Sequence, residues 1–162
     1  YLFIDTLQMT PLIYSYLFII IAMGYFAGNS LMMLLNKHHF TPIKIMNIGI
    51  YTSLIGLIIL ISSVILANKS AIIISVTTGV IIMRAASALI IAPAQVKILE
   101  HFKERGALAL GMSSAMQFTC ASIAISSVAL FHSSALYGLI GVSIMFFVPT
   151  IILMRKLRQL FA

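Results

Sequence analysis

The sequence predicts an all-α integral membrane protein built as a single helical membrane domain over residues 1–162. Of the 162 residues, 62% are hydrophobic and only 8% are charged, against about 25% charged in an ordinary soluble domain. The mean hydropathy is +1.15, so too few polar side chains remain to cover a water-soluble globule of this size. Apolar windows of roughly 20 residues, the length that crosses a bilayer as a helix, recur along the chain.

Five such windows predict transmembrane helices, over residues 11–35, 45–67, 71–97, 106–131 and 134–154. The first opens at Pro11, and its Gly24 and Gly28 have the small-xxx-small spacing that allows a close helix crossing. The second contains the charge-free run 55–66, whose backbone groups are satisfied in lipid only as a helix. Period-two alternation, the mark of a membrane barrel strand, is missing from these windows.

Two of the other three windows contain a charged residue or a proline. The third contains Arg84 and Pro93, and the fifth contains Pro149. Each proline removes an intrahelical hydrogen bond, so we expect a kink at both positions. The connections between windows are short, which makes neighbouring helices antiparallel.

Side-chain size predicts which helices lie inside the bundle. Window 106–131 is rich in Ala, Ser and Gly, so we expect it to be surrounded by protein. The second and fifth windows carry large aliphatic and aromatic residues that suit lipid contact, among them Leu57, Leu60, Met145 and Phe147. We therefore expect these two helices on the outside.

Basic residues predict the orientation of the chain. Eight of the ten fall on one side of the predicted topology: Lys37, Lys44, Lys97, Lys103, Arg105, Arg155, Lys156 and Arg158. The opposite side holds Lys69, and Arg84 lies within a span. Because Lys and Arg accumulate in cytoplasmic loops, we expect the carboxyl end to be cytoplasmic and the amino end extracytoplasmic.

Arg84 is the first candidate for a substrate-binding residue. It lies roughly thirteen residues into its helix, about 20 Å from the outer end and near the middle of the bilayer. Charges at that depth usually face a bundle interior or a wet cavity and mark a transport pathway. Ser87 shares its helical face and joins the candidate set. The alternative is a structural arginine that bonds carbonyls or snorkels toward the cytoplasm.

Three further residues complete the candidate substrate-binding set. Gln117 shares one side of the fourth helix with Ser113 and Cys120, and an amide at that depth needs a partner or water. An interhelical hydrogen bond explains it as well as ligand contact does. Tyr14 and Phe18 would line an apolar pocket, although ordinary packing is the simpler explanation.

Several function classes have no support in the sequence. The adjacent His38 and His39 lack the spacing that presents two imidazoles to one metal, and we expect no metal and no cofactor. Protease motifs are missing, so we expect no enzyme. The basic residues lie in short gaps between apolar runs rather than on a polar face, which argues against a nucleic-acid partner.

Three stretches carry a family pattern. They are the run Phe-Ile-Asp-Thr-Leu-Gln-Met-Thr-Pro at 3–11 continuing to Phe18, Gly28 with Leu-Asn-Lys at 35–37 and Lys44, and residues 93–109 ending at Gln117 and Phe118. Together they resemble the Bcr/CflA-type multidrug/proton antiporters of the major facilitator superfamily. The resemblance implies that the chain is the five-helix portion, segments eight to twelve, of the carboxyl-terminal six-helix bundle.

The resemblance also implies what lies outside the chain. We expect about 200 or more residues upstream, including a full seventh segment and the amino-terminal half of the transporter. That half would hold the main proton-coupling carboxylate and would be a partner of the present helices.

The expected function is proton-coupled efflux of drug-like amphipathic small molecules by alternating access, in a multi-pass protein of the bacterial inner membrane. Its partners would be a small-molecule substrate, protons and the lipid bilayer. One alternative is uptake of an anionic or zwitterionic solute such as an organic acid, amino acid or osmolyte, because Arg84 suits a carboxylate. Another is a membrane scaffold or assembly subunit that transports nothing.

Overall fold

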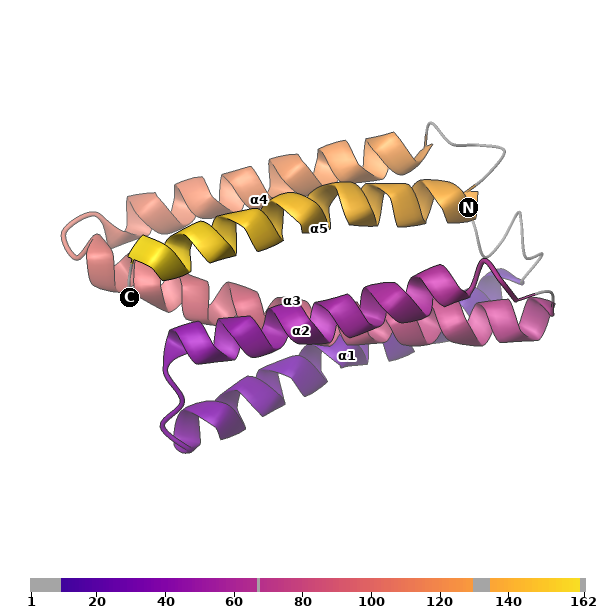
Figure 1. Cartoon of the computed structure of the whole chain (residues 1–162), viewed down its shortest axis with the longest axis horizontal. Helices are drawn as coiled ribbons and strands as arrows, with labels where there is room; N and C mark the ends of the chain where they lie inside the picture. Colours follow the sequence, from indigo (N-terminus) through magenta and orange to yellow (C-terminus); the bar gives the residue numbers. More distant parts are fainter. Residues whose placement is uncertain (1–9, 67, 130–134, 161–162) are drawn as a thin grey trace.

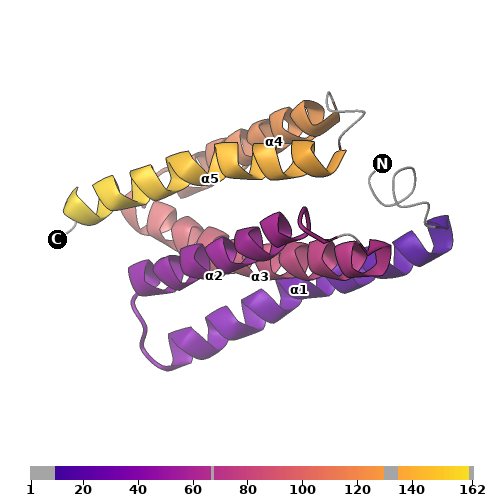
Figure 2. The ribbon, with the colours of Figure 1, turned by 45° about the vertical axis from the view of Figure 1, so that its right-hand side comes forward.

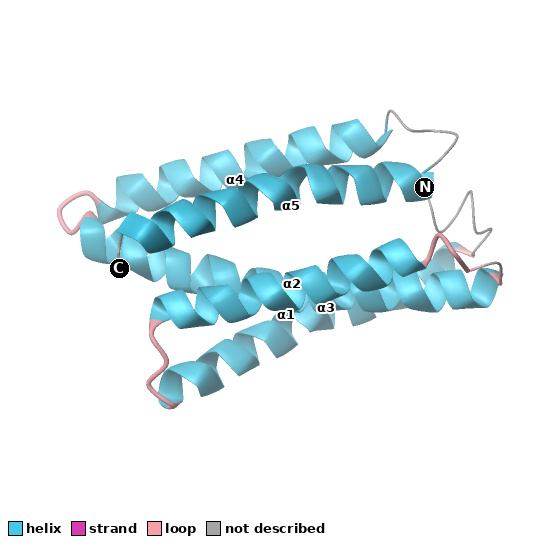
Figure 3. Cartoon of the chain, viewed as in Figure 1, coloured by secondary structure: helices cyan, strands magenta, loops and turns pink. Residues whose placement is uncertain are grey.

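The computed structural model describes residues 10–66, 68–129 and 135–160, and within these ranges the chain consists of helices and turns (Figures 1 and 3). The helices are α1 Pro11–Lys37, α2 Pro42–Ser62, α3 Lys69–His101, α4 Gly106–Ala129 and α5 Ala135–Leu160. Helices α1 to α4 are long and apolar enough to cross a membrane, and α5 contains the apolar stretch Leu136–Ile152. The predicted all-α, multi-pass membrane class is confirmed at this level.

The helix starts follow from local residue chemistry. Both α1 and α2 begin at a proline that follows an extended threonine, Thr10 or Thr41. Proline is favoured at a first helical position because its missing N–H would have no intrahelical acceptor there. The second helix therefore begins at Pro42, three residues before the predicted start. Helix α3 begins after Asn68, whose Oδ1 accepts a hydrogen bond from the N–H of Ser70 at 3.0 Å.

The second helix also ends earlier than predicted, at Ser62 rather than 67. The hydroxyls of Ser62 and Ser63 donate to the carbonyls of Ile59 and Leu60, at 2.7 and 2.6 Å. Three successive backbone hydrogen bonds then follow, each between an N–H and the carbonyl three residues earlier, and they form a tight turn that ends at Ile65. The helix is therefore terminated by its own serines, a local effect that hydropathy does not register.

Three helices run past their predicted ends, α1 by two residues to Lys37 and the other two by more. Helix α3 continues through a buried Pro93 to His101, four residues past the predicted end. Helix α5 continues to Leu160 instead of 154. In both cases the helix extends into polar and basic residues beyond the apolar window, because hydropathy marks the membrane part of a helix and not its full length. The predicted bounds at 67, 131 and 134, and residues 3–9, lie outside the described residues.

Helix α3 is the central element, and α1 crosses it through the two predicted glycines. A Cβ added at Gly24 would lie 2.8 Å from the carbonyl oxygen of Ile81, and one at Gly28 would overlap the carbonyl of Ala85. Both glycines are buried. The close crossing predicted from the small-xxx-small spacing is confirmed.

Helix α2 packs on another face of α3, and here the prediction is wrong. Gly49 and Gly56 are buried, and a Cβ at Gly56 would lie 2.7 Å from Cγ of Met83. The Ser75 hydroxyl adds an interhelical hydrogen bond of 2.9 Å to the carbonyl of Ile59. Because small residues let the two backbones approach, α2 is a packed helix rather than one that only faces lipid.

The core cluster joins α2, α3 and α5. Leu57, Leu60, Val76 and Ile140 are buried together. Leu57 and Leu60 were expected to face lipid, and Phe147 of α5, expected there too, packs against this cluster. Only one stripe of each helix is occupied in this way, since Met145 and Ile58 remain exposed. The expectation that α2 and α5 lie outside is therefore wrong for one face of each.

Helix α4 also departs from the prediction. It runs beside α5 and meets α3 near the turn that joins them (Figures 1 and 2), yet none of its residues 106–128 is buried. Its small residues are spread over all faces, so they provide no single seam on which a neighbour can close. The described helices leave α4 exposed instead of surrounding it.

The two ends of the bundle differ in charge. The α1–α2 turn, the α3–α4 turn and the carboxyl terminus lie at one end, and the α2–α3 connection lies at the other (Figures 1 and 2). The first end carries the turns with Lys37, Lys44, Lys103 and Arg105, whereas Lys69 is at the opposite end. We call the first the basic end.

Candidate functional site

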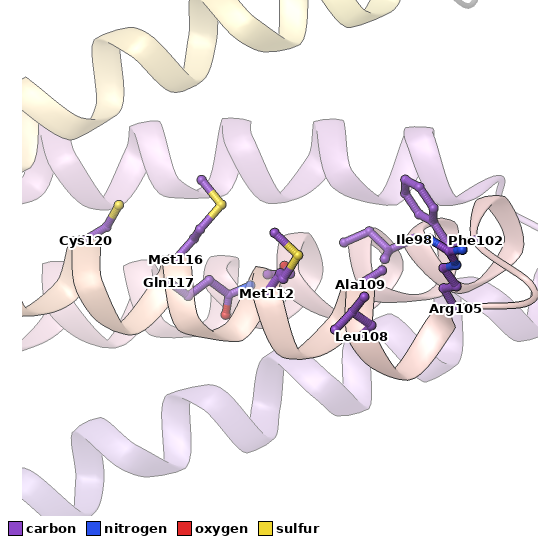
Figure 4. Close-up of a pocket in the computed structure, with 10 residues that line it drawn as sticks. Ile98, Phe102, Arg105, Leu108, Ala109, Met112, Met116, Gln117 and Cys120 are labelled. Carbon is purple, nitrogen blue, oxygen red and sulfur yellow. The ribbon is translucent and has the colours of Figure 1, made fainter.

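A groove of about 740 Å³ runs along α4 from the α3–α4 turn (Figure 4). Its walls are Ile98 and Phe102 from the end of α3, Arg105 from the turn, and Leu108, Ala109, Met112, Ser113, Met116, Gln117 and Cys120 from α4. The volume falls within the range of small-molecule sites, about 300–1,000 Å³. The lining is almost entirely apolar, so the groove suits a hydrophobic chain or ring.

Helical spacing explains why these residues share a wall. Arg105, Ala109, Met112, Met116 and Cys120 recur every three or four residues, which places them on one stripe of α4. Figure 4 shows Met112, Met116 and Cys120 pointing to the same side of the helix. Methionine is flexible and polarizable, and it adapts to ligands of different shape.

The charged groups of the groove lie at its outer end, in the α3–α4 turn. Lys97 and Glu100 form an ion pair of 2.6 Å on the last turns of α3. Arg105 lines the groove, and among the described residues its guanidinium has no hydrogen-bond or ion-pair partner. Glu104 precedes it in the sequence and is exposed. One unpaired guanidinium therefore faces the mouth of an apolar groove.

Arg84 lies apart from the groove. It is about 22 Å along α3 from Lys69, near the middle of a helix of 33 residues. Its side chain is exposed, between the face that receives Gly24 of α1 and the face that receives Gly56 of α2. Within the described part of the chain, no acid and no carbonyl binds its guanidinium. The helix thus presents an unpaired cation near the middle of its length.

Ser87 and Thr77 lie three and seven residues from Arg84, on the same stripe of α3, and they have different roles. The hydroxyl of Ser87 donates to the carbonyl of Arg84 at 2.7 Å, so this donor is engaged by the backbone. Thr77 is buried, and its Oγ1 has no partner in the part of the chain that the structure describes. This stripe of α3 is therefore buried at Thr77 and exposed at Arg84.

Tyr14 and Phe18 lie near the start of α1. Their ring centroids are 6.4 Å apart at an interplanar angle of 43°, and Phe18 is exposed. Such a tilted pair one helical turn apart is an ordinary aromatic contact. Neither residue lines the groove on α4.

The five predicted substrate-binding residues thus fall into three places. Gln117 lines the groove, together with Ser113 and Cys120, as their spacing on one side of the helix predicts. Arg84 with Ser87 lies on α3, and Tyr14 with Phe18 on α1. The sequence reasoning missed Arg105, Met112 and Met116, although their three- and four-residue spacing was a visible signal.

No group of three or more His, Cys, Asp or Glu that could hold a metal ion occurs among the described residues. In comparisons with protein families, curated proteins and solved structures, no match to this chain is found.

Proposed function

We propose that this chain forms part of a secondary transporter that exports drug-like amphipathic molecules in exchange for protons, by alternating access. It would be the five-helix portion of a major facilitator carboxyl-terminal bundle and would work with an amino-terminal half. The resemblance of the stretches at 3–18, 28–44 and 93–118 to multidrug/proton antiporters supports the export direction. The basic end supports a cytoplasmic carboxyl terminus, and the resemblance is what places the proposed transporter in a bacterial inner membrane.

Arg84 is the observation that carries this proposal. A charged side chain at the centre of a membrane helix raises the insertion free energy by about 2.5–3.5 kcal/mol. The described residues offer Arg84 no counter-ion. Water in a pathway, or an anionic group that passes through it, would supply the missing solvation. A transport pathway beside α3 therefore accounts for a charged residue at this position.

The same residue favours the second candidate. A guanidinium binds a carboxylate through two parallel hydrogen bonds, which suits uptake of an anionic or zwitterionic solute. A scaffold that transports nothing is the third candidate, and in it Arg84 would be a structural or snorkelling arginine.

Proton flux in vesicles separates these candidates. The complete gene product is reconstituted with a pH-sensitive dye inside, and chloramphenicol, benzoate and alanine are added in turn as probes of a neutral drug, an organic anion and a zwitterion. Export predicts proton movement driven by chloramphenicol. A response only to benzoate or alanine would replace the proposal with the uptake candidate, and no response to a broad panel of such compounds would favour the scaffold.

A further inference from the structure

The groove along α4 begins at the basic end of the bundle and is lined by apolar side chains as far as Gln117 and Cys120. We infer that it binds an anionic phospholipid of the adjacent leaflet, with the headgroup phosphate on Arg105 and one acyl chain along α4. The groove shares Gln117 with the candidate substrate-binding set, so the test of the lipid site uses Arg105 and Met116, which have no role in the proposed transport.

The length of the groove matches one leaflet. Arg105 and Gln117 are about 18 Å apart along the helix axis, at 1.5 Å per residue. Half of a hydrocarbon core of about 30 Å is about 15 Å. An acyl chain whose headgroup lies at Arg105 therefore ends near Gln117, one helical turn before Cys120 at the far end of the groove.

The walls suit a flexible chain. Met112 and Met116 are 62% and 69% exposed and stand beside each other on the groove side of α4. Phe102, which directly follows α3, closes the end of the groove at the α3–α4 turn. Unbranched methionine side chains adjust to a chain that changes its own conformation, whereas a rigid aromatic wall would select a fixed shape.

Charge complementarity selects an anionic headgroup. Glu100 is occupied by Lys97 at 2.6 Å, so it is not available to Arg105. Lys103 and Arg105 then outnumber Glu104, the remaining acid of the turn. A planar guanidinium binds phosphate oxygens in a bidentate manner, and a headgroup without a compensating ammonium leaves that attraction intact.

Lipid-specific fluorescence quenching tests the inference. These 162 residues contain no Trp, so Met116→Trp places a single reporter in the groove once any Trp elsewhere in the complete gene product has been replaced by Phe. Phe118→Trp is the matched control, because Phe118 is 74% exposed, lies at nearly the same depth and does not line the groove. The full chain is placed in vesicles of phosphatidylcholine with a minor fraction of phosphatidylglycerol. In one sample the phosphatidylglycerol carries bromine in the middle of its acyl chain, and in the other the phosphatidylcholine carries it. The lipid composition, and with it the surface charge, is the same in both.

At Met116→Trp we expect brominated phosphatidylglycerol to quench about fivefold more per molecule than brominated phosphatidylcholine, the ratio expected for one basic residue facing an anionic lipid. Phe118→Trp should show no preference. Adding Arg105→Gln should abolish the preference at the groove, and Arg105→Lys should keep part of it.

Three results would overturn the site. Equal quenching by the two lipids at Met116→Trp would mean an uncharged or non-selective groove. An equal preference at Phe118→Trp would mean general enrichment of anionic lipid around the chain. Quenching at Phe118→Trp but by neither lipid at Met116→Trp would mean that another helix or a second copy covers the groove.

Discussion

Arg84 carries a charge near the middle of a helix that is long and apolar enough to span the membrane, and no described residue pairs with that charge. Its guanidinium lies at mid-depth and has no described partner, while the carbonyl of the same residue accepts a hydrogen bond from Ser87. A side chain in water and a side chain bound to a buried acid respond differently to removal. Removal of a hydrated side chain lowers transport without lowering stability. Removal of a side chain that is bound to a buried acid leaves that acid unpaired and lowers stability.

We predict that Arg84→Ala lowers transport by the complete protein about tenfold or more, since a charge-assisted hydrogen bond to substrate is lost, while thermal stability in detergent stays near that of the parent. Arg84→Lys should rescue partly if the charge alone matters and hardly at all if recognition is bidentate. Thr78→Ala, an exposed polar change on another face of α3, is the control.

Vesicle transport and helix melting followed by circular dichroism measure both quantities. Parent-level transport and stability in both Arg84 variants would show that this arginine snorkels harmlessly. A large loss of stability would instead assign it a buried acidic partner outside the described residues.

At the scale of single helices, the crossing of α1 over α3 depends on missing side chains. We predict that Gly28→Val lowers the free energy of unfolding by about 1–3 kcal/mol, because the new side chain would meet the backbone of Ala85. Ala27→Val, next to it on the exposed side of α1, should change stability by less than about 0.5 kcal/mol. Equal melting temperatures for the two variants would contradict the crossing.

The packed stripe of α2 gives a second prediction at this scale. Leu60 is 1% exposed and belongs to the core cluster, whereas Ile58 is 58% exposed. Leu60→Ala should destabilise the bundle by about 2–5 kcal/mol through the cavity it leaves, and Ile58→Ala should have a small effect. Unfolding in detergent with increasing denaturant compares the two. Similar losses for both would restore α2 to the outside of the bundle.

At the scale of the whole molecule, the charge asymmetry between the two ends predicts which side of the membrane each end faces. In a background that carries Cys120→Ser and lacks any other cysteine of the complete gene product, Lys69→Cys should react with an impermeant maleimide in intact cells. Lys103→Cys, on the basic end, should react only after permeabilisation. The reverse pattern would invert the proposed orientation, and with it the cytoplasmic carboxyl terminus.

Much of the fold is predictable because its causes are local. Apolar windows must be helical in lipid to satisfy their backbone groups, so five windows give five helices. The glycine pair at 24 and 28 predicts one helix crossing, and the spacing of Ser113, Gln117 and Cys120 predicts one wall of the groove. The misplaced ends are local too, but they depend on the serines at 62 and 63 and on polar extensions that hydropathy does not weigh.

The sequence by itself determined the membrane class, the number and approximate extent of the helices, and the basic end, because composition and backbone hydrogen bonding act within one segment. Only the tertiary structure decided that α2 closes on α3 through Gly49 and Gly56, that α4 stays exposed, and that Arg105 meets the methionines of α4 in one groove. In a bilayer every helix face is already in an apolar solvent, so hydrophobicity does not choose partners. The choice depends on which shapes fit together across two helices, and that information is not contained in either helix alone.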